Sequence, residues 1–148
     1  MKLRFKQKEI LEIAKKILGE VIKTKSNKAK VIALSGDLGA GKTTLTKEIG
    51  KLFGIKESII SPTFVIMKIY KIDSKSKYFS SFKKLIHIDA YRLNSGEELL
   101  KIGWNEICND KDNLIIVEWP ERVESALDKD IYMIKLGHID DETRSIEF

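Results

Sequence analysis

Apolar and polar positions alternate with two different periods along the chain, and these periods divide it into short elements. Apolar side chains between residues 8 and 22 recur at intervals of three and four, which predicts an amphipathic helix. The runs VIALS (31–35) and NLIIVEW (113–119) are almost continuously apolar, as in strands that are buried on both faces of a sheet. Helical spacing resumes over residues 42–53, so the pattern predicts a strand, a loop and a helix in succession.

The later part of the chain predicts further strands and one hairpin. The same signals indicate strands at 64–70 and 84–91, a short helix at 96–102, and strands at 131–136 and 143–148. The lysine- and serine-rich connector between the first two of these strands has no helical period, so we expect them to pair antiparallel. Buried strands need helices on both faces. We therefore expect one domain over residues 1–148, an α/β fold with a mainly parallel central sheet and one antiparallel hairpin.

Composition narrows the class of protein without deciding its function. The chain has 148 residues, of which 43% are hydrophobic, and this suits a single domain with a real core. The net charge of +5 permits contact with nucleic acid, but lysines occur along the whole sequence, which favours a solvated surface over a dedicated RNA groove. Cys108 is the single cysteine, so an internal disulfide is excluded. With neither a signal peptide nor a membrane-spanning run in the sequence, we expect a cytoplasmic protein without membrane contact.

The stretch LSGDLGAGKTTLTKEIG (34–50) carries the clearest chemical signal. It matches the phosphate-binding pattern G-x-x-x-x-G-K-[ST] without a gap, and it lies between a predicted strand and a predicted helix, as this motif requires. Glycines let backbone amides approach phosphate oxygens, and the helix N-terminus directs unpaired N–H groups at the same anion. The residues expected to bind the phosphates are Gly36, Asp37, Leu38, Gly39, Ala40, Gly41, Lys42, Thr43 and Thr44.

Two residues at the end of this loop have distinct expected roles. Lys42 can reach the β- and γ-phosphates of a nucleotide, and the Thr43 hydroxyl can ligate Mg²⁺. A glycine-rich turn with a chance lysine is the alternative, and the strand–loop–helix context argues against it. The motif specifies the fold further, as a P-loop NTPase-like fold in three layers. It does not separate ATPases, GTPases and kinases.

Three further polar residues are candidates for the chemistry. Thr63, in SPTF (61–64), could orient water or touch the γ-phosphate, and a Ser-Pro turn ahead of a strand explains the same residues equally well. Asp89 and Glu118 each stand where an apolar strand ends, the position from which a carboxylate reaches a ligand. Burying a carboxylate is unfavourable unless it is paired or bound to metal. A lysine partner or a helix cap is possible for either, but the nearby glycine-rich loop favours a metal or water role.

The motifs GDLGAGKTT, SPTF, HIDAYRL and EW together resemble the bacterial TsaE (formerly YjeE) family, in the family's order. The resemblance covers Val31 to Phe148. It implies an ATPase that uses ATP/ADP with Mg²⁺ and is required to make threonylcarbamoyladenosine at position 37 of tRNAs that read ANN codons. It also implies that TsaD and TsaB are partners, and that tRNA is reached indirectly through their complex. The sequence has no N-K-x-D signature for guanine, in agreement with adenine.

The resemblance also implies roles for single residues. Lys42 and Thr43 would hold phosphate and Mg²⁺, Glu118 would be a metal-linked carboxylate, and Arg144 would lie near the nucleotide. The expected catalytic residues are Asp89, Thr63 and Lys42. Which of the two carboxylates is the principal metal ligand stays open, and we favour Glu118 because it ends the more continuously apolar strand.

Some alternatives remain at this stage. A small-molecule kinase would share the loop and the fold class, but it needs an arginine-bearing lid, and only Arg122 and Arg144 follow Glu118. A nucleotide-dependent assembly module with negligible turnover is a third reading. Trp119 fits a site role and core packing equally well. The basic segment 71–84 looks longer than the family's hairpin, and its role is open.

Overall fold

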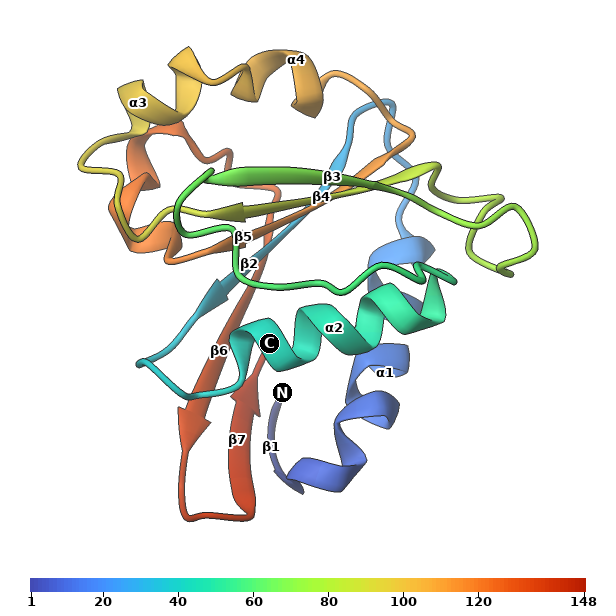
Figure 1. The fold of residues 1–148 in the computed structure, drawn as a ribbon, viewed down its shortest axis with the longest axis vertical. Coiled ribbons are helices and arrows are strands. Elements are labelled where there is room, and N and C mark those ends of the chain that lie inside the picture. Colours follow the sequence, from blue (N-terminus) through green and yellow to red (C-terminus); the bar gives the residue numbers. More distant parts are fainter.

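Seven strands form one mixed sheet at the centre of the computed structural model, which describes residues 1–148 in full (Figure 1). The strands are β1 (Lys2–Lys6), β2 (Lys30–Ser35), β3 (Met67–Lys71), β4 (Lys84–Asp89), β5 (Asn113–Glu118), β6 (Tyr132–His138) and β7 (Thr143–Glu147). Their order across the sheet is β1-β7-β6-β2-β5-β4-β3. The central strands β6, β2, β5 and β4 are parallel, whereas β3 pairs antiparallel with β4. The expected α/β fold with a parallel centre and a β3–β4 hairpin is confirmed. The sheet has more antiparallel pairing than the single hairpin predicted, because β7 pairs antiparallel with both β6 and β1.

Helices cover both faces of this sheet and complete three layers. The helices are α1 (Ile10–Lys23), α2 (Lys42–Leu52), α3 (Gly96–Lys101) and α4 (Trp104–Cys108), with 3₁₀ turns at Gln7–Glu9, Pro120–Arg122 and Glu124–Ala126. Figure 1 shows α1 and α2 on one side of the central strands and α3 and α4 on the other. None of them combines the length and the apolar character that a membrane crossing requires.

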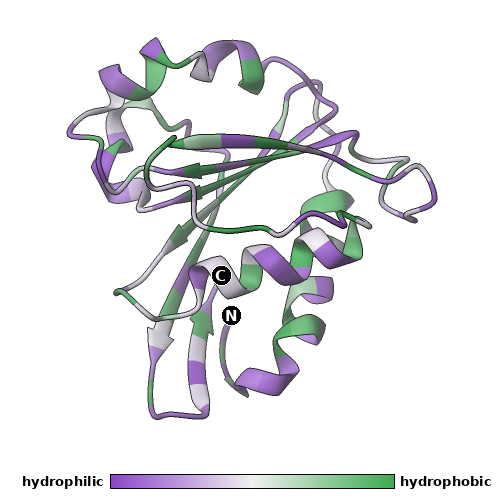
Figure 2. Ribbon diagram, viewed as in Figure 1, coloured by the Kyte–Doolittle hydropathy of each residue, from purple (hydrophilic) through white to green (hydrophobic).

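The hydrophobic pattern explains these layers. Every residue of β5 is buried, because helices pack over both of its faces, as its continuous apolar run predicted. The apolar stripe of α1 faces the larger of two hydrophobic clusters, which lies beneath α1 and α2, and the smaller cluster lies beneath α3 and α4. Figure 2 shows the resulting contrast between hydrophobic central strands and helices with mixed surfaces.

The structure differs from the predicted elements in three places. Residues 2–6 form the edge strand β1, which the sequence did not indicate because only Phe5 among them is buried. The strand predicted at 64–70 begins only at Met67, because Ile66 has a φ of 69° and its N–H bonds to Pro62. The short α4 follows α3 after a left-handed Gly103 and was not predicted.

Parallel pairing brings the polar carboxyl ends of the strands together at one end of the sheet. Glu118 is in register with Leu34 of β2 on one side and with Asp89 of β4 on the other. The glycine-rich loop leaves β2 one residue later and leads into α2. Residues that are far apart in the sequence therefore meet beside the loop.

At the opposite end of the strands, the connection from β3 to β4 packs onto the end of α2. Phe53 is fully buried, and its ring centroid lies 5.6 Å from that of Tyr78 and 6.3 Å from that of Phe82. The N–H of Asp73 donates to the Phe53 carbonyl at 3.0 Å, and the Ser76 hydroxyl donates to that of Leu52 at 2.8 Å. This basic segment is therefore held to the core by its own aromatic side chains.

Replacing the residue that anchors this connection tests the packing. We expect Phe53→Ala to lower the free energy of unfolding by about 3–5 kcal/mol, since it leaves a cavity between α2 and the hairpin connection. Urea unfolding measures this, with exposed Ile22→Ala as a control that changes stability by less than about 1 kcal/mol. Equal stability of the two variants would contradict the described packing.

Candidate functional site

The glycine-rich loop adopts a backbone that only glycine accommodates well. Gly36, Gly39 and Gly41 have φ values of 145°, 79° and 105°. A Cβ on Gly36 would lie 2.4 Å from the carbonyl oxygen of Leu136, so this residue lets the loop pass close to β6. A Cβ on Gly39 or Gly41 would meet nothing within 4 Å. The two later glycines therefore line open space, as a loop that wraps around a ligand requires.

This open space belongs to a cleft of about 380 Å³ at the carboxyl ends of the central strands. The cleft is lined by residues of the loop and α2, of the SPTF segment, and of the ends of β4 and β5: Leu38, Gly39, Gly41, Lys42, Thr43, Thr44, Ser61, Thr63, Asp89, Tyr91, Glu118 and Trp119. In open α/β sheets, ligands bind in a crevice outside the carboxyl ends of the strands. The position and the lining of this cleft both suit a ligand with phosphate groups.

Lys42 supplies a positive charge to this cleft without a carboxylate bonded to it. The residue is 5% exposed, and its Nζ donates to the carbonyls of Gly36 at 2.5 Å and Asp37 at 3.0 Å. The Nζ also lies 4.3 Å from the ring centroid of Trp119. Burial lowers the pKa of Lys42, and nearby carboxylates, first of all Glu118, partly oppose this shift. A phosphate chain would provide the missing counter-charge.

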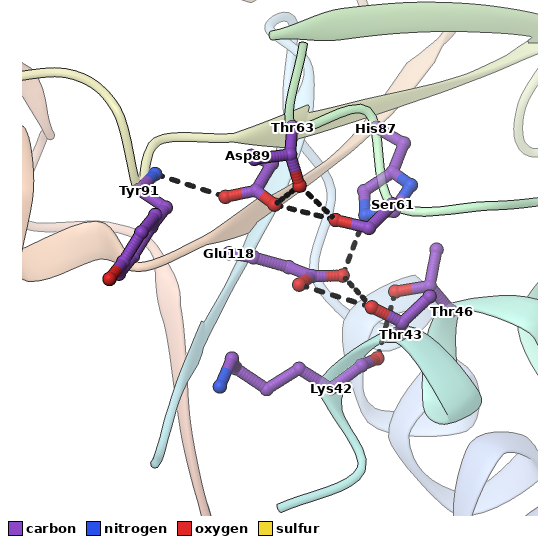
Figure 3. Close-up of polar contacts among 9 residues, drawn as sticks. All are labelled: Lys42, Thr43, Thr46, Ser61, Thr63, His87, Asp89, Tyr91 and Glu118. Carbon is purple, nitrogen blue, oxygen red and sulfur yellow. Dashed lines mark hydrogen bonds and ion pairs between the residues drawn. The ribbon is translucent and has the colours of Figure 1, made fainter. Parts of the chain in front are cut away.

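Glu118 connects the loop helix to two strands. The side chain is 2% exposed, and the Thr43 hydroxyl donates to its Oε1 at 3.0 Å and lies 3.3 Å from its Oε2 (Figure 3). Nε2 of the fully buried His87 lies 2.7 Å from Oε1. Because a carboxylate only accepts hydrogen bonds, Nε2 carries the proton, and Nδ1 is left without a partner. His87 and Thr43 thus both donate to Oε1 of Glu118 and hold this carboxylate in place.

Asp89 forms a second network with the SPTF segment (Figure 3). Its Oδ2 accepts hydrogen bonds from the hydroxyls of Ser61 at 2.5 Å and Thr63 at 3.0 Å. Its Oδ1 accepts from the N–H of Tyr91 at 3.0 Å. The two carboxylates thus have separate partners, one on the loop helix and the other on the segment before β3.

The donor set of the cleft fits a nucleotide with Mg²⁺. No three His, Cys, Asp or Glu side chains in the structure gather into a metal centre of their own. Mg²⁺ commonly keeps several waters and is held by one or two protein oxygens together with substrate phosphates. Thr43 and Glu118 offer such oxygens beside a bare loop with a buried ammonium. These residues therefore suit a magnesium–nucleotide complex better than a metal alone.

The structure brings most of the predicted site residues together and places a few elsewhere. Gly36 and Asp37 contribute carbonyls to Lys42 instead of lining the cleft, and Ala40 is buried beneath the loop. Arg144 lines a separate hollow of about 40 Å³ behind the loop and donates to the carbonyls of Asp140 and Thr143. Arg144 was predicted to lie near the nucleotide, and the structure places it behind the loop, outside the cleft.

Three residues of the site had not been placed in it from the sequence, namely Ser61, His87 and Tyr91, and a fourth, Trp119, had been left open. His87 had been given no role in the site, and its Nε2 has a hydrogen-bond partner in the carboxylate of Glu118. The available signal was its spacing, because His87 and Asp89 stand two residues apart on one strand and point to the same face. Trp119 lines the cleft beneath the Lys42 ammonium and also packs against the smaller hydrophobic cluster, so it takes part in both the site and the core.

A comparison with protein families agrees with this geometry. A family model described as "Threonylcarbamoyl adenosine biosynthesis protein TsaE" matches residues 6–146. The chain belongs to the TsaE family. TsaE proteins are involved in the biosynthesis of threonylcarbamoyladenosine in tRNA, so the resemblance seen in the four motifs is confirmed.

Individual TsaE relatives show how far the similarity extends. The tRNA threonylcarbamoyladenosine biosynthesis protein TsaE of Haemophilus influenzae is 33% identical over 138 residues, which cover 93% of this chain and 81% of that protein. The protein of the same name from Rickettsia conorii is 39% identical over 115 residues, covering 77% of this chain and only 60% of the relative. The crystal structure of Bacillus subtilis YdiB matches with a TM-score of 0.68 and 27% identity, over 99% of this chain and 83% of the other.

The buried histidine generates a prediction about this TsaE chain. We expect His87→Leu to weaken magnesium-dependent ADP binding by about 10–100-fold, because Glu118 loses the donor that orients it. His87→Gln keeps an N–H donor of similar reach and should preserve most of the affinity. Calorimetry with ADP, in the presence of Mg²⁺ and of EDTA, separates a magnesium effect from a general loss.

Thermal unfolding of both variants provides the control, since a misfolded protein would lose ADP binding with and without Mg²⁺. Unchanged magnesium dependence in folded His87→Leu would show that Thr43 alone orients the carboxylate.

Proposed function

We propose that this TsaE chain binds ATP and ADP with Mg²⁺ and hydrolyses ATP slowly, to support threonylcarbamoyladenosine modification at position 37 of tRNA through a TsaD–TsaB complex. The observation that carries the proposal is the convergence of Lys42, Thr43 and Glu118 on a bare glycine loop. The family supplies the tRNA context and the partners. Adenine is inferred from the TsaE resemblance and from the missing guanine signature.

The loop side of the cleft would bind the phosphates. Backbone N–H groups of the loop and the first turn of α2 would donate to phosphate oxygens, and the ammonium of Lys42 would leave the loop carbonyls to join them. Thr43 and Glu118 would hold Mg²⁺ directly or through water. When bound, Mg²⁺ neutralises charge on the β- and γ-phosphates.

The Asp89 network would serve the attacking water. Asp89 already accepts hydrogen bonds from Ser61, Thr63 and the Tyr91 N–H, so its carboxylate is held facing the cleft. A carboxylate in this position can accept a proton from water or orient it. The hydroxyl of Thr63 would then report to Asp89 whether a γ-phosphate is present. The hydrogen bond from Thr63 to Asp89 supports a role of SPTF in orienting water or contacting the γ-phosphate over a simple Ser-Pro turn.

The kinase alternative has less support. Neither Arg122 nor Arg144 lines the cleft, since Arg122 packs over the Tyr91 ring at 5.3 Å and Arg144 lies behind the loop. An arginine-bearing lid over the phosphates is therefore not part of this arrangement.

Lys42→Ala tests the nucleotide assignment and the function together. A charge-assisted hydrogen bond contributes about 1.5–3 kcal/mol, so the variant should bind ADP roughly 10–100-fold more weakly. It should also fail to support repeated rounds of tRNA modification in a reconstituted mixture with TsaD, TsaB and threonylcarbamoyl-adenylate. Calorimetry and counting of modified tRNA measure the two effects, with Lys47→Ala on the exposed face of α2 as the control.

Either of two results would oppose the proposal. Full ADP affinity in Lys42→Ala would show that the cleft does not bind nucleotide as proposed. Repeated tRNA modification in the complete absence of the chain would show that the chain is not required for it.

The two carboxylates should not be interchangeable. We expect Glu118→Ala to abolish most of the magnesium dependence of nucleotide binding, because Glu118 is bonded to Thr43. Asp89→Ala should leave ADP binding within about threefold and lower the rate of ATP hydrolysis about 100-fold or more, as for loss of a general base. Magnesium titrations and single-turnover hydrolysis measure both effects. The reverse pattern would show that Asp89 is the principal metal ligand.

A further inference from the structure

Positive charge gathers at the end of the sheet opposite the cleft, where β2 and β4 begin. Segments 23–30 and 71–84 both lie there, because they lead into these two strands and β3 also terminates there. Figure 1 shows these two connections on the right of the molecule and the glycine-rich loop on the left. Together the segments contain nine lysines and a single acidic residue, Asp73. We call these two segments the lysine edge.

Most of these lysines have no acidic partner. Lys23 pairs with Glu20 on α1, and no other lysine of the lysine edge forms an ion pair. Lys30 and Lys83 are partly buried, and the remaining seven are exposed. Unpaired ammonium groups at high density repel one another, and an anionic partner relieves this repulsion.

Neighbouring acidic groups offset part of this charge. Asp128 and Asp130 line a hollow together with Lys28, so the charge of segment 23–30 is partly balanced, whereas segment 71–84 has only Asp73. Asp110 and Asp112 precede β5, between the two segments, and both are half-buried. An oxygen of the Asp110 carboxylate accepts the N–H of Asp112, and the Asp112 carbonyl accepts the N–H groups of Lys83 and Lys84. These groups mainly hold the connections in place.

The lysine edge is a built surface and not a loose tail. Tyr78 and Phe82 fix the connection between β3 and β4 against Phe53. The fold therefore brings lysines from two distant parts of the sequence to one end of the strands.

We propose that the lysine edge binds the sugar–phosphate backbone of structured RNA, with tRNA as the natural occupant. The lysines are spread over two connections instead of converging on a pocket, which suits a repeating phosphate chain better than a single anion. The tRNA context rests on the family and on the proposed function. Direct contact adds to the indirect contact expected through TsaD and TsaB, and it leaves the nucleotide cleft free at the other end.

Two triple variants with equal net charge test this proposal. One replaces Lys71, Lys75 and Lys77 by glutamine, and the control replaces Lys8, Lys16 and Lys101, which are exposed elsewhere. Fluorescence anisotropy of labelled tRNA, at several salt concentrations, measures affinity for the full chain. We expect the first variant to bind about 10–100-fold more weakly and its salt slope to fall by about 2–3, and the control to stay within about threefold.

Substitutions in segment 23–30 and a measurement of ADP binding complete the test. Lys25→Gln with Lys28→Gln should also weaken tRNA binding, and all variants should keep the ADP affinity of the parent, which reports folding and an intact cleft. Equal losses in the two triple variants, or no tRNA binding by the parent, would overturn the proposal. So would unchanged tRNA binding combined with weaker binding of the TsaD–TsaB complex to the first variant. If the chain failed to bind ADP but its binding of tRNA still depended on the lysine edge, the proposed function would be wrong and the tRNA proposal would stand.

Discussion

A buried carboxylate at the end of β5 constrains the whole cleft. Glu118 is 2% exposed, and an unpartnered carboxylate in such a place would destabilise the fold by several kcal/mol. Its partners come from two other elements, the Thr43 hydroxyl on α2 and His87 on β4. Meeting this requirement fixes the start of the loop helix against the ends of the central strands. The same contacts place the two carboxylate oxygens of Glu118 beside the bare loop.

The second carboxylate links the cleft to a segment that is less tightly held. Asp89 binds the hydroxyls of Ser61 and Thr63, and its N–H donates to the Ile66 carbonyl at 2.8 Å. Ile66 has a left-handed backbone, which is strained for a β-branched residue. Phe64 and Val65 beside it are 82% and 68% exposed. A strained turn tied to Asp89 and bearing exposed apolar side chains suits a segment that would respond to the nucleotide proposed to bind in the cleft.

Short stretches of sequence predicted those parts of the structure that depend on neighbouring residues alone. The loop glycines, Lys42 and Thr43 are contiguous, and the strand and helix around them follow from simple periodicity. His87 escaped assignment because its role depends on pairing between β4 and β5, which brings it to a residue 31 positions away. The edge strand β1 was missed because a strand with one buried residue resembles a charged terminus. The lysine edge likewise became visible only when the topology brought two distant connections to one side.

The pairing of β2 has a consequence for how the chain acquires its structure during synthesis. Its two neighbours in the sheet are β5 and β6, which begin at Asn113 and Tyr132. The most apolar strand of the first half therefore has no pairing partner until most of the chain has been made. Such long-range parallel pairing is slow, and the waiting strand is prone to association with other chains. Nascent TsaE of this type should thus depend on α1 and α2 to cover β2 until its partners emerge.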